Sequence, residues 1–199
     1  MARRSEHTQE ELREMVLNAA ESILVEDGIA ALKVRNIAMD IGYTIGSIYM
    51  VFHNMADLNL HLKARTLDNI AADLQGIDQR FAVAEECLLE LAKAYLAYAH
   101  ANYNRWQMLF EHRSRNEDLY PEWYLEKVAQ IFRLVERQFQ RLKPEASQPE
   151  VARAARALWS GVHGICYLSF SGSLDVAQVD DVEATVVLLT QSFLRGWQS

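Results

Sequence analysis

Apolar residues along this chain recur at steps of three and four positions, and no segment shows the two-residue alternation of a half-buried strand. The first stripe is followed directly by Asp27 and Gly28, and it consists of Leu12, Met15, Val16, Ala19, Ala20, Ile23 and Leu24. These spacings predict an amphipathic helix that ends near Gly28. Because the later stripes have the same period, we expect the fold to be all-α.

Two short amphipathic segments follow this helix, with a glycine between them. Each carries two apolar residues on one helical face, Ile37 with Ile41 and Ile48 with Val51. Gly42 stands where a tight turn requires the left-handed backbone conformation, and Thr44 is placed to cap the second helix. The spacing predicts a helix-turn-helix within residues 34–58, a unit that places its second helix in the major groove of DNA. An ordinary helical hairpin in a core is the alternative.

The rest of the chain carries longer helical stripes, separated by glycine, proline and polar segments. They predict helices over about 56–75 (ended by Gly76), 81–102, 106–112, 121–142, 149–170 and 180–197, with a polar loop at 171–178. The inward faces are expected to hold Leu88, Leu91, Tyr95 and Tyr98 in one helix and Leu125, Val128, Phe132, Val135, Phe139 and Leu142 in another. The predicted architecture has about nine helices, with a three-helix DNA-binding domain over residues 1–54 and a helical bundle over residues 55–199.

The last predicted helix is apolar on two sides. One stripe contains Val182, Val186, Leu189 and Phe193, and the other contains Val187, Thr190 and Leu194. A helix with two apolar sides needs two packing partners, one of which we expect to be a second subunit. Val186, Leu189 and Phe193 are the residues that such an intersubunit interface would contain. A central buried helix in a monomer is the alternative.

Residues 12–62 resemble the N-terminal domain of the TetR family of one-component transcriptional regulators. The matching positions are the amphipathic first helix, Gly28, Ala31-Leu32, Ile37-Ala38, Gly42-Tyr43-Thr44, Gly46-Ser47-Ile48-Tyr49, Phe52 and Asp57-Leu58. Two positions depart from the family pattern. Lys33 stands where the family usually has a Ser or Thr that caps the helix, and Met55 stands where it favours Lys.

The resemblance implies a repressor that binds a palindromic operator as a homodimer, pairs its last two helices in a four-helix bundle and is released by a small-molecule effector. Trp159, His163 and Gly164 resemble the Trp…His-Gly signature of one subgroup of TetR-like C-terminal domains. Gly161 and Gly164 would let a neighbouring backbone approach closely, so we favour helix packing over ligand binding for this segment.

Under this interpretation, the second short helix enters a major groove of double-stranded DNA. Thr44 and Ser47 are expected to hydrogen-bond bases or phosphates, and Tyr49 is expected to reach the backbone. Arg3 and Arg4 are expected to add minor-groove contacts. The full set assigned to DNA is Lys33, Arg35, Thr44, Ile45, Gly46, Ser47, Tyr49, His53 and Asn54.

The net charge of −7 stands against this interpretation, since DNA binding usually requires a basic surface. Residues 1–65 contain seven basic and nine acidic residues. Residues 33–54, however, contain two basic residues against Asp40 alone. We therefore expect DNA affinity to depend on the dimer and on phosphate contacts made by neutral groups and helix dipoles.

Aromatic residues gather between residues 95 and 124, where the resemblance implies an effector site. The residues assigned to a pocket for a small apolar or aromatic effector are Tyr98, Trp106, Phe110, Trp123 and Tyr124. Aromatic residues at helical spacing also fill ordinary cores, and this alternative stays open.

The sequence shows no organised catalytic set and no metal-ligand spacing. His163 and Cys166 are neighbours on a helix, but no orienting carboxylate is adjacent. We expect no enzyme activity, no cofactor and no metal; an all-α enzyme and a helical adaptor without an effector are the rival interpretations. The cysteine usage, the lack of a signal-like apolar segment and the short apolar runs predict a cytoplasmic protein without a membrane span.

Overall fold

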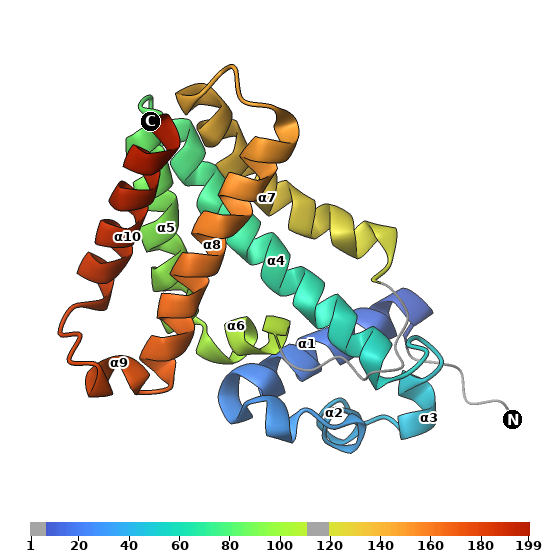
Figure 1. Cartoon of the computed structure of the whole chain (residues 1–199). Coiled ribbons are helices and arrows are strands. Elements are labelled where there is room, and N and C mark those ends of the chain that lie inside the picture. The colour runs from blue at the N-terminus through green and yellow to red at the C-terminus, as the bar shows by residue number, and fades with distance from the viewer. Residues whose placement is uncertain (1–6, 111–119) are drawn as a thin grey trace, which may run out of the picture. The chain divides into compact units, whose positions relative to one another are not determined.

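The computed structural model describes residues 7–110 and 120–199, and throughout these residues the regular structure is helical, with no strand. Figure 1 shows the helices in chain order. They form two compact units. Of the described residues, the first unit contains those up to Thr66 and those from 102 to 110, and the second contains 67–101 and 120–199. The predicted all-α fold, with a helix-turn-helix followed by a helical bundle, is confirmed.

The first unit begins with a well-capped helix. Its elements are α1 (Gln9–Asp27), the 3-10 turn η1 (Ile29–Ala31), α2 (Val34–Asp40), α3 (Ile45–Ile48), the first part of α4 (Met55–Arg80) and α6 (Tyr103–Phe110). Glu11 N donates to Thr8 Oγ1 at 3.2 Å, and Thr8 N donates to the Glu11 carboxylate at 2.7 Å, which forms a capping box. α1 ends as predicted at Gly28, whose φ of 77° favours glycine.

One apolar core holds the first unit together. Its most buried members include Val16 of α1, Ile37 of α2 and Ile48 of α3, each with no exposed surface. Met108 of α6 belongs to the same core and is 1% exposed. Although α6 follows α5 in the sequence, it therefore packs with the helix-turn-helix.

The second unit is a bundle of longer helices. It contains the part of α4 after Thr66 and five further helices: α5 (Ala84–Ala101), α7 (Glu122–Leu142), α8 (Gln148–Phe170), the short α9 (Ser173–Val176) and α10 (Val182–Gln198). α10 and α7 each pack against both α5 and α8. The residues predicted to face inward from α5 are all buried, namely Leu88, Leu91, Tyr95 and Tyr98.

The predicted end of α4 at Gly76 is wrong, because the helix continues to Arg80. Ile77 is only 6% exposed and anchors the additional turn. Arg80 Nε also donates to the Gly76 carbonyl oxygen at 3.1 Å. A glycine inside a helix costs about 1 kcal/mol relative to alanine, and burial of one isoleucine offsets that cost.

Two further expectations need correction. Leu125 is 51% exposed, because Tyr124 is the residue that α7 buries at this turn. The segment 171–178 contains α9 rather than a continuous loop. Gly172 has a left-handed backbone conformation with φ 70° before this short helix, and Leu174 is buried. The small and polar residues of this segment predict a loop, and its apolar residues are too few to show a helical period.

Candidate nucleic-acid interface and the other predicted sites

The backbone between α2 and α3 makes the tight turn that the sequence predicts. Gly42 has φ 71°, and Tyr43 N donates to the Ala38 carbonyl oxygen at 3.0 Å. Thr44 then caps α3, since its Oγ1 accepts a hydrogen bond from Ser47 N at 3.1 Å. The predicted cap is therefore confirmed, and it fixes where the backbone of α3 begins.

The start of α2 lacks a side-chain cap, in keeping with the lysine at this position. Lys33 makes no capping hydrogen bond through its side chain. Asn36 Nδ2 instead donates to the Ala31 carbonyl oxygen at 2.8 Å and holds the preceding turn. Lys33 and Arg35 are both exposed beside the first amide groups of α2, an arrangement that favours an anion such as phosphate.

Core and surface positions separate clearly along α3 and the turn after it. Ile48 is fully buried and Phe52 is 2% exposed, whereas Ile45 and Tyr49 are 39% and 43% exposed. Ser47 is half-buried. The other residues assigned to DNA are exposed, namely Lys33, Arg35, Thr44, Ile45, Gly46, Tyr49, His53 and Asn54. Their contacts with DNA stay a prediction.

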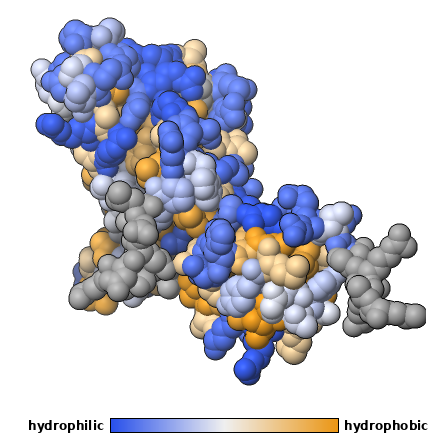
Figure 2. Space-filling view, turned by 90° about the vertical axis from the view of Figure 1, so that its right-hand side faces the viewer, coloured by the Kyte–Doolittle hydropathy of each residue, from blue (hydrophilic) through white to orange (hydrophobic). Residues whose placement is uncertain are grey.

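Two exposed methionines extend this surface, and sequence reasoning missed them. Met50, directly after Tyr49, is 69% exposed, and Met39 at the end of α2 is 77% exposed. In Figure 2, hydrophobic surface interrupts the hydrophilic surface of the molecule. The signal was present in the sequence, since position 50 must face outward once Ile48 and Phe52 face the core. In protein–DNA complexes, apolar side chains on a helix in the major groove can contact thymine methyl groups.

Asn54 has a structural role in addition to its predicted contact with DNA. Asp57 N donates to Asn54 Oδ1 at 2.9 Å, and His53 N donates to Asp57 Oδ2 at 2.9 Å. These reciprocal bonds cap the start of α4. The side-chain carbonyl of Asn54 is therefore committed to the helix cap.

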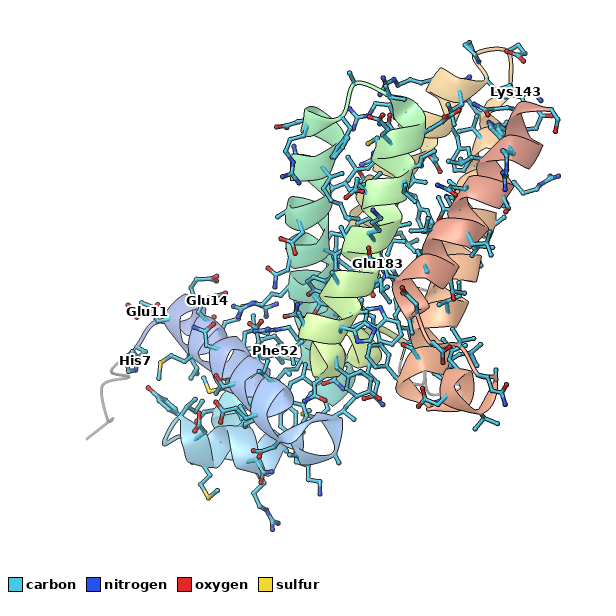
Figure 3. All side chains as sticks on the ribbon, turned by 90° about the vertical axis from the view of Figure 1, so that its left-hand side faces the viewer. His7, Glu11, Glu14, Phe52, Lys143 and Glu183 are labelled. Atoms are coloured by element: carbon cyan, nitrogen blue, oxygen red, sulfur yellow. The ribbon has the colours of Figure 1, made fainter. Side chains whose placement is uncertain are left out.

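Arg13 of α1 connects the chain after α3 to α4. Its Nη1 donates to the Val51 carbonyl oxygen at 2.7 Å, and its Nη2 donates to His61 Nε2 of α4 at 2.6 Å. The guanidinium carbon also lies 4.3 Å from the ring centre of Phe52, which Figure 3 labels. We call Arg13, Val51, Phe52 and His61 the Arg13 cluster. It fixes the end of the helix-turn-helix against two neighbouring helices.

His61 must be neutral to take part in this cluster. An arginine only donates hydrogen bonds, so His61 Nε2 is the acceptor. Burial and the nearby charge of Arg13 lower the pKa of His61, while Asp57, whose Oδ1 lies 3.5 Å from His61 Nε2, opposes the shift. Protonation of His61 would remove the acceptor that Arg13 uses.

The segment before α1 also contacts the turn of the helix-turn-helix. His7 Nδ1 lies 2.7 Å from the Tyr43 hydroxyl oxygen, within hydrogen-bond distance. Arg3 and Arg4, which the sequence assigns to the minor groove, lie outside the described residues.

The five residues assigned to an effector belong to different units. Trp106 and Phe110 are in the first unit, where Trp106 is 2% exposed and its ring centre lies 5.3 Å from that of Phe110. Tyr98, Trp123 and Tyr124 are in the second unit. Burial raises the pKa of Tyr124 to about 12. The effector role of all five residues stays a prediction.

The second unit contains another aromatic cluster, which sequence reasoning did not assign to a site. His163 stacks on Trp159 with ring centres 5.1 Å apart, and Trp159 meets Phe132 edge-on at 5.6 Å. The Tyr95 hydroxyl lies 3.0 Å from His163 Nδ1. Burial lowers the pKa of His163. The cluster therefore combines apolar ring faces with a polar Tyr95–His163 pair, drawn from α5, α7 and α8.

The two glycines of α8 differ in their surroundings. A Cβ atom at Gly161 would lie 2.7 Å from Leu189 Cδ2, so the absence of a side chain lets α10 pack closely. A Cβ atom at Gly164 would meet nothing within 4 Å. Close packing is therefore confirmed at Gly161, against a side chain of the same chain, and is not seen at Gly164.

All three residues assigned to a dimer interface pack within the chain, but only Val186 is fully buried, and the interface role of the half-buried Leu189 and Phe193 stays a prediction. Val186 has no exposed surface, so its assignment to an intersubunit contact is corrected to the bundle core. Leu189 packs over Gly161, and Phe193 contacts Phe139 edge-on with ring centres 5.9 Å apart. The large apolar residues exposed on α8 and α10 are Leu188, Tyr167 and Leu168, with 63%, 62% and 42% exposure.

The remaining candidate chemistry concerns a buried thiol, metal ligands and membrane spans. Cys166 is buried, and burial raises the pKa of its thiol to about 12, which disfavours the thiolate. Three or more histidine, cysteine or acidic residues do not converge as a metal site anywhere in residues 7–110 and 120–199. Within the same described residues, no helix has the length and apolar character needed to cross a membrane.

The sequence matches the family model of the tetracyclin repressor-like C-terminal domain over residues 88–193, more than half of the chain. No protein with curated annotation matches the sequence. The structure is similar to that of a protein of unknown function from Rhodococcus sp. RHA1, with 21% identity, a TM-score of 0.79, and coverage of 99% of this chain and 100% of that one.

Two regulators with solved structures share the fold. PfmR, a TetR family transcriptional regulator from Thermus thermophilus, has 18% identity, a TM-score of 0.60, and coverage of 90% of this chain and 97% of that one. FadR from Bacillus subtilis, solved in complex with stearoyl-CoA, has 16% identity, a TM-score of 0.61, and coverage of 94% and 97%.

Proposed function

Because the chain belongs to the TetR family of transcriptional regulators, we propose that it is a repressor that binds a palindromic operator as a homodimer and leaves it when a small molecule binds. Family membership points to a DNA-binding regulator rather than an enzyme. The observation that carries the proposal is the capped turn between α2 and α3, with Ile48 buried and Tyr49 exposed. This is the geometry that presents a short helix to a major groove.

In this proposal, residues 1–54 form the DNA-binding domain, and residues 55–199 mediate dimerisation and bind the effector. Tyr49 and Ile45 present exposed side chains from α3 to the groove. The Ser47 and Thr44 hydroxyls lie 2.9 Å apart, so they meet bases or phosphates as a coupled pair. Lys33, Arg35 and His53 contact phosphates beside them.

A palindromic operator requires two subunits, because each half-site accepts one recognition helix. The exposed apolar side chains of α8 and α10 support a dimer through these helices, as a surface for a second copy. Leu188→Glu should therefore shift sedimentation from dimer to monomer and abolish operator binding. Val176→Glu is the matched control, since Val176 on α9 is 86% exposed. A wild-type chain that sediments as a monomer would exclude this part of the proposal.

The effector is proposed to be a small apolar or aromatic molecule bound in the C-terminal domain. In the second unit, Trp159, Phe132 and the Tyr95–His163 pair supply ring faces and a polar group for such a ligand. The complex of Bacillus subtilis FadR with stearoyl-CoA supports this proposal, since a protein of the same fold accepts a ligand with a long apolar chain. The effector and the operator should weaken each other's binding by the same factor.

The test of DNA binding uses an operator selected from a random duplex library. The double variant Ser47→Ala, Tyr49→Ala should bind this operator at least tenfold more weakly, because each lost contact costs about 1 kcal/mol or more. Val176→Ala is the control variant. Fluorescence anisotropy at one fixed salt concentration gives the affinities, and circular dichroism verifies the fold.

Two results would contradict the proposal. Selection that recovers no sequence would argue against a specific operator. A double variant that binds as tightly as the parent would exclude α3 as the recognition helix. For the effector, a thermal-shift screen of apolar and aromatic compounds should yield ligands that also release the operator. Stabilising compounds without any effect on operator affinity would favour a regulator without an effector.

A further inference from the structure

A cleft of about 760 Å³ in the second unit lies apart from every site considered above. The C-terminal half of α7 forms one wall, and Ala71 and Gln75 of α4 and Gln148 of α8 complete it. The residues from α7 are Gln130, Arg133, Leu134, Glu136, Arg137, Gln140 and Arg141. This volume is within the range of small-molecule sites, and eight of the ten lining residues have polar side chains.

Three arginines give the cleft a positive charge. Arg133, Arg137 and Arg141 recur every fourth residue, so they lie along one face of α7 over about 12 Å. Among the lining residues the only acid is Glu136, and Arg156 of α8 donates to its carboxylate at 2.6 Å. The two lining residues from α4, Ala71 and Gln75, are uncharged. The cleft is thus locally basic in a chain with a net charge of −7.

Two hydrogen bonds hold the guanidinium of Arg141 in place. Its Nη1 donates to Gln138 Oε1 at 2.6 Å, and its Nη2 donates to the Ala82 carbonyl oxygen. Gln138 is only 1% exposed. A polar side chain is costly to bury unless it is hydrogen-bonded, so this glutamine orients the arginine.

The end of the cleft is also ordered. Gln140 Nε2 donates to the carbonyl oxygens of Pro144 and Ala146, at 3.0 and 3.1 Å, in the turn between α7 and α8. Gln148 Nε2 donates to Gln140 Oε1 at 2.9 Å. Figure 3 labels Lys143 in this turn. These bonds fix two glutamines as part of the cleft wall.

Arg133 can exchange its present partner for a ligand. It binds Glu126 at 2.6 Å, and the two side chains are 51% and 54% exposed. Such an exposed pair contributes little to stability, because solvent screens it. An anion with more than one charge would compete with the single carboxylate of Glu126.

We propose that this cleft binds a small molecule that carries two phosphate groups. The planar guanidinium matches phosphate with two parallel hydrogen bonds, and the arginine row provides for two such groups. Glutamine side chains supply donors and acceptors for the remainder of the ligand. This ligand is distinct from the apolar effector proposed above, and its site shares no residue with the DNA-binding set.

The test is calorimetric titration of the full-length chain with inorganic pyrophosphate and, separately, with adenosine diphosphate, in the absence of DNA. Both should bind, and Arg137→Gln should weaken each by about tenfold or more. Arg153→Gln is the matched control, because Arg153 is an exposed arginine of α8 outside the cleft. Thermal melting verifies that Arg137→Gln folds, and Arg133→Gln provides a second variant with the same expectation.

Three outcomes would overturn the proposal. In the first outcome, the parent chain would give no binding heat at millimolar ligand. In the second, Arg153→Gln would weaken binding as much as Arg137→Gln does, which would indicate a general effect of charge rather than a specific site. In the third outcome, random-sequence duplex DNA displaces pyrophosphate and Arg137→Gln weakens DNA binding, which would make the cleft a DNA contact. Because the titration contains no operator, failure of the proposed function leaves its result unchanged.

Discussion

Replacing Arg13 by methionine should both destabilise the first unit and weaken operator binding. Methionine keeps an unbranched apolar stem but removes the guanidinium that binds Val51 and His61 and covers Phe52. A hydrogen bond from a charged donor contributes about 1.5–3 kcal/mol, and a cation–π contact at a partly exposed site about 0.5–1 kcal/mol. The His61 bond adds little to this sum, because the His61 side chain is 28% exposed and water can replace the guanidinium there.

These contributions give an expected loss of about 2–4 kcal/mol in the free energy of unfolding of the first unit. Urea unfolding followed by circular dichroism measures this change. Operator affinity should fall by about tenfold or more, because no guanidinium then holds the Val51 carbonyl at the end of the helix-turn-helix. Arg13→Lys should be intermediate, because an ammonium group reaches one acceptor but lacks the planar fork.

The matched control is Arg153→Met, which removes an exposed arginine and should leave both measurements unchanged. Parent-like stability and operator affinity in Arg13→Met would refute the structural role of the Arg13 cluster. Equal losses in Arg13→Lys and Arg13→Met would refute the argument from guanidinium geometry while leaving the importance of the position intact.

The free energy of unfolding should fall as the pH is lowered from 7.5 to 5.5. The unfolded chain protonates His61 and His163 near the ordinary pKa of about 6.5, whereas the folded chain resists protonation, so stability is lost below that value. Urea unfolding at both pH values measures this loss, which should shrink in the variant His61→Gln, His163→Gln; an unchanged pH dependence would exclude these histidines. Gly164→Ala should raise stability by about 0.5–1 kcal/mol through helix propensity, and Gly161→Ala should lie about 1–3 kcal/mol below it because the new Cβ meets Leu189. Equal stability of the two alanine variants would contradict the packing at Gly161.

The helix-turn-helix could be predicted because its signals are local. Gly42 supplies the positive φ of the turn. Thr44 caps α3 by accepting a hydrogen bond from the backbone N–H of Ser47, three residues further along the chain. Neither feature depends on distant parts of the chain. The same holds for the end of α1 at Gly28, where a stripe of seven apolar residues simply stops.

The features that sequence reasoning missed are set by distant partners. Arg13 looks like an ordinary polar residue of α1, because its acceptor is a backbone carbonyl 38 residues away. Gly76 looks like a helix end, and only the burial of Ile77 shows why α4 continues. Val186 was assigned to an interface because periodicity reveals an apolar side but does not identify what covers it.

The acidic balance of the first unit is compatible with DNA binding once its ion pairs are considered. Glu14 and Glu21 of α1 bind Arg65 of α4 at 2.5 and 3.2 Å, and Arg105 of α6 binds Glu21 at 3.0 Å. These carboxylates are therefore partly compensated by neighbouring guanidinium groups, and solvent salt screens charges separated by more than about 8 Å. What a phosphate encounters is the local charge of residues 33–54, which is mildly positive. Under the proposed function, so few cations should give weak nonspecific attraction, and we expect specific affinity to come from the side chains of α3 and from two half-sites bound together.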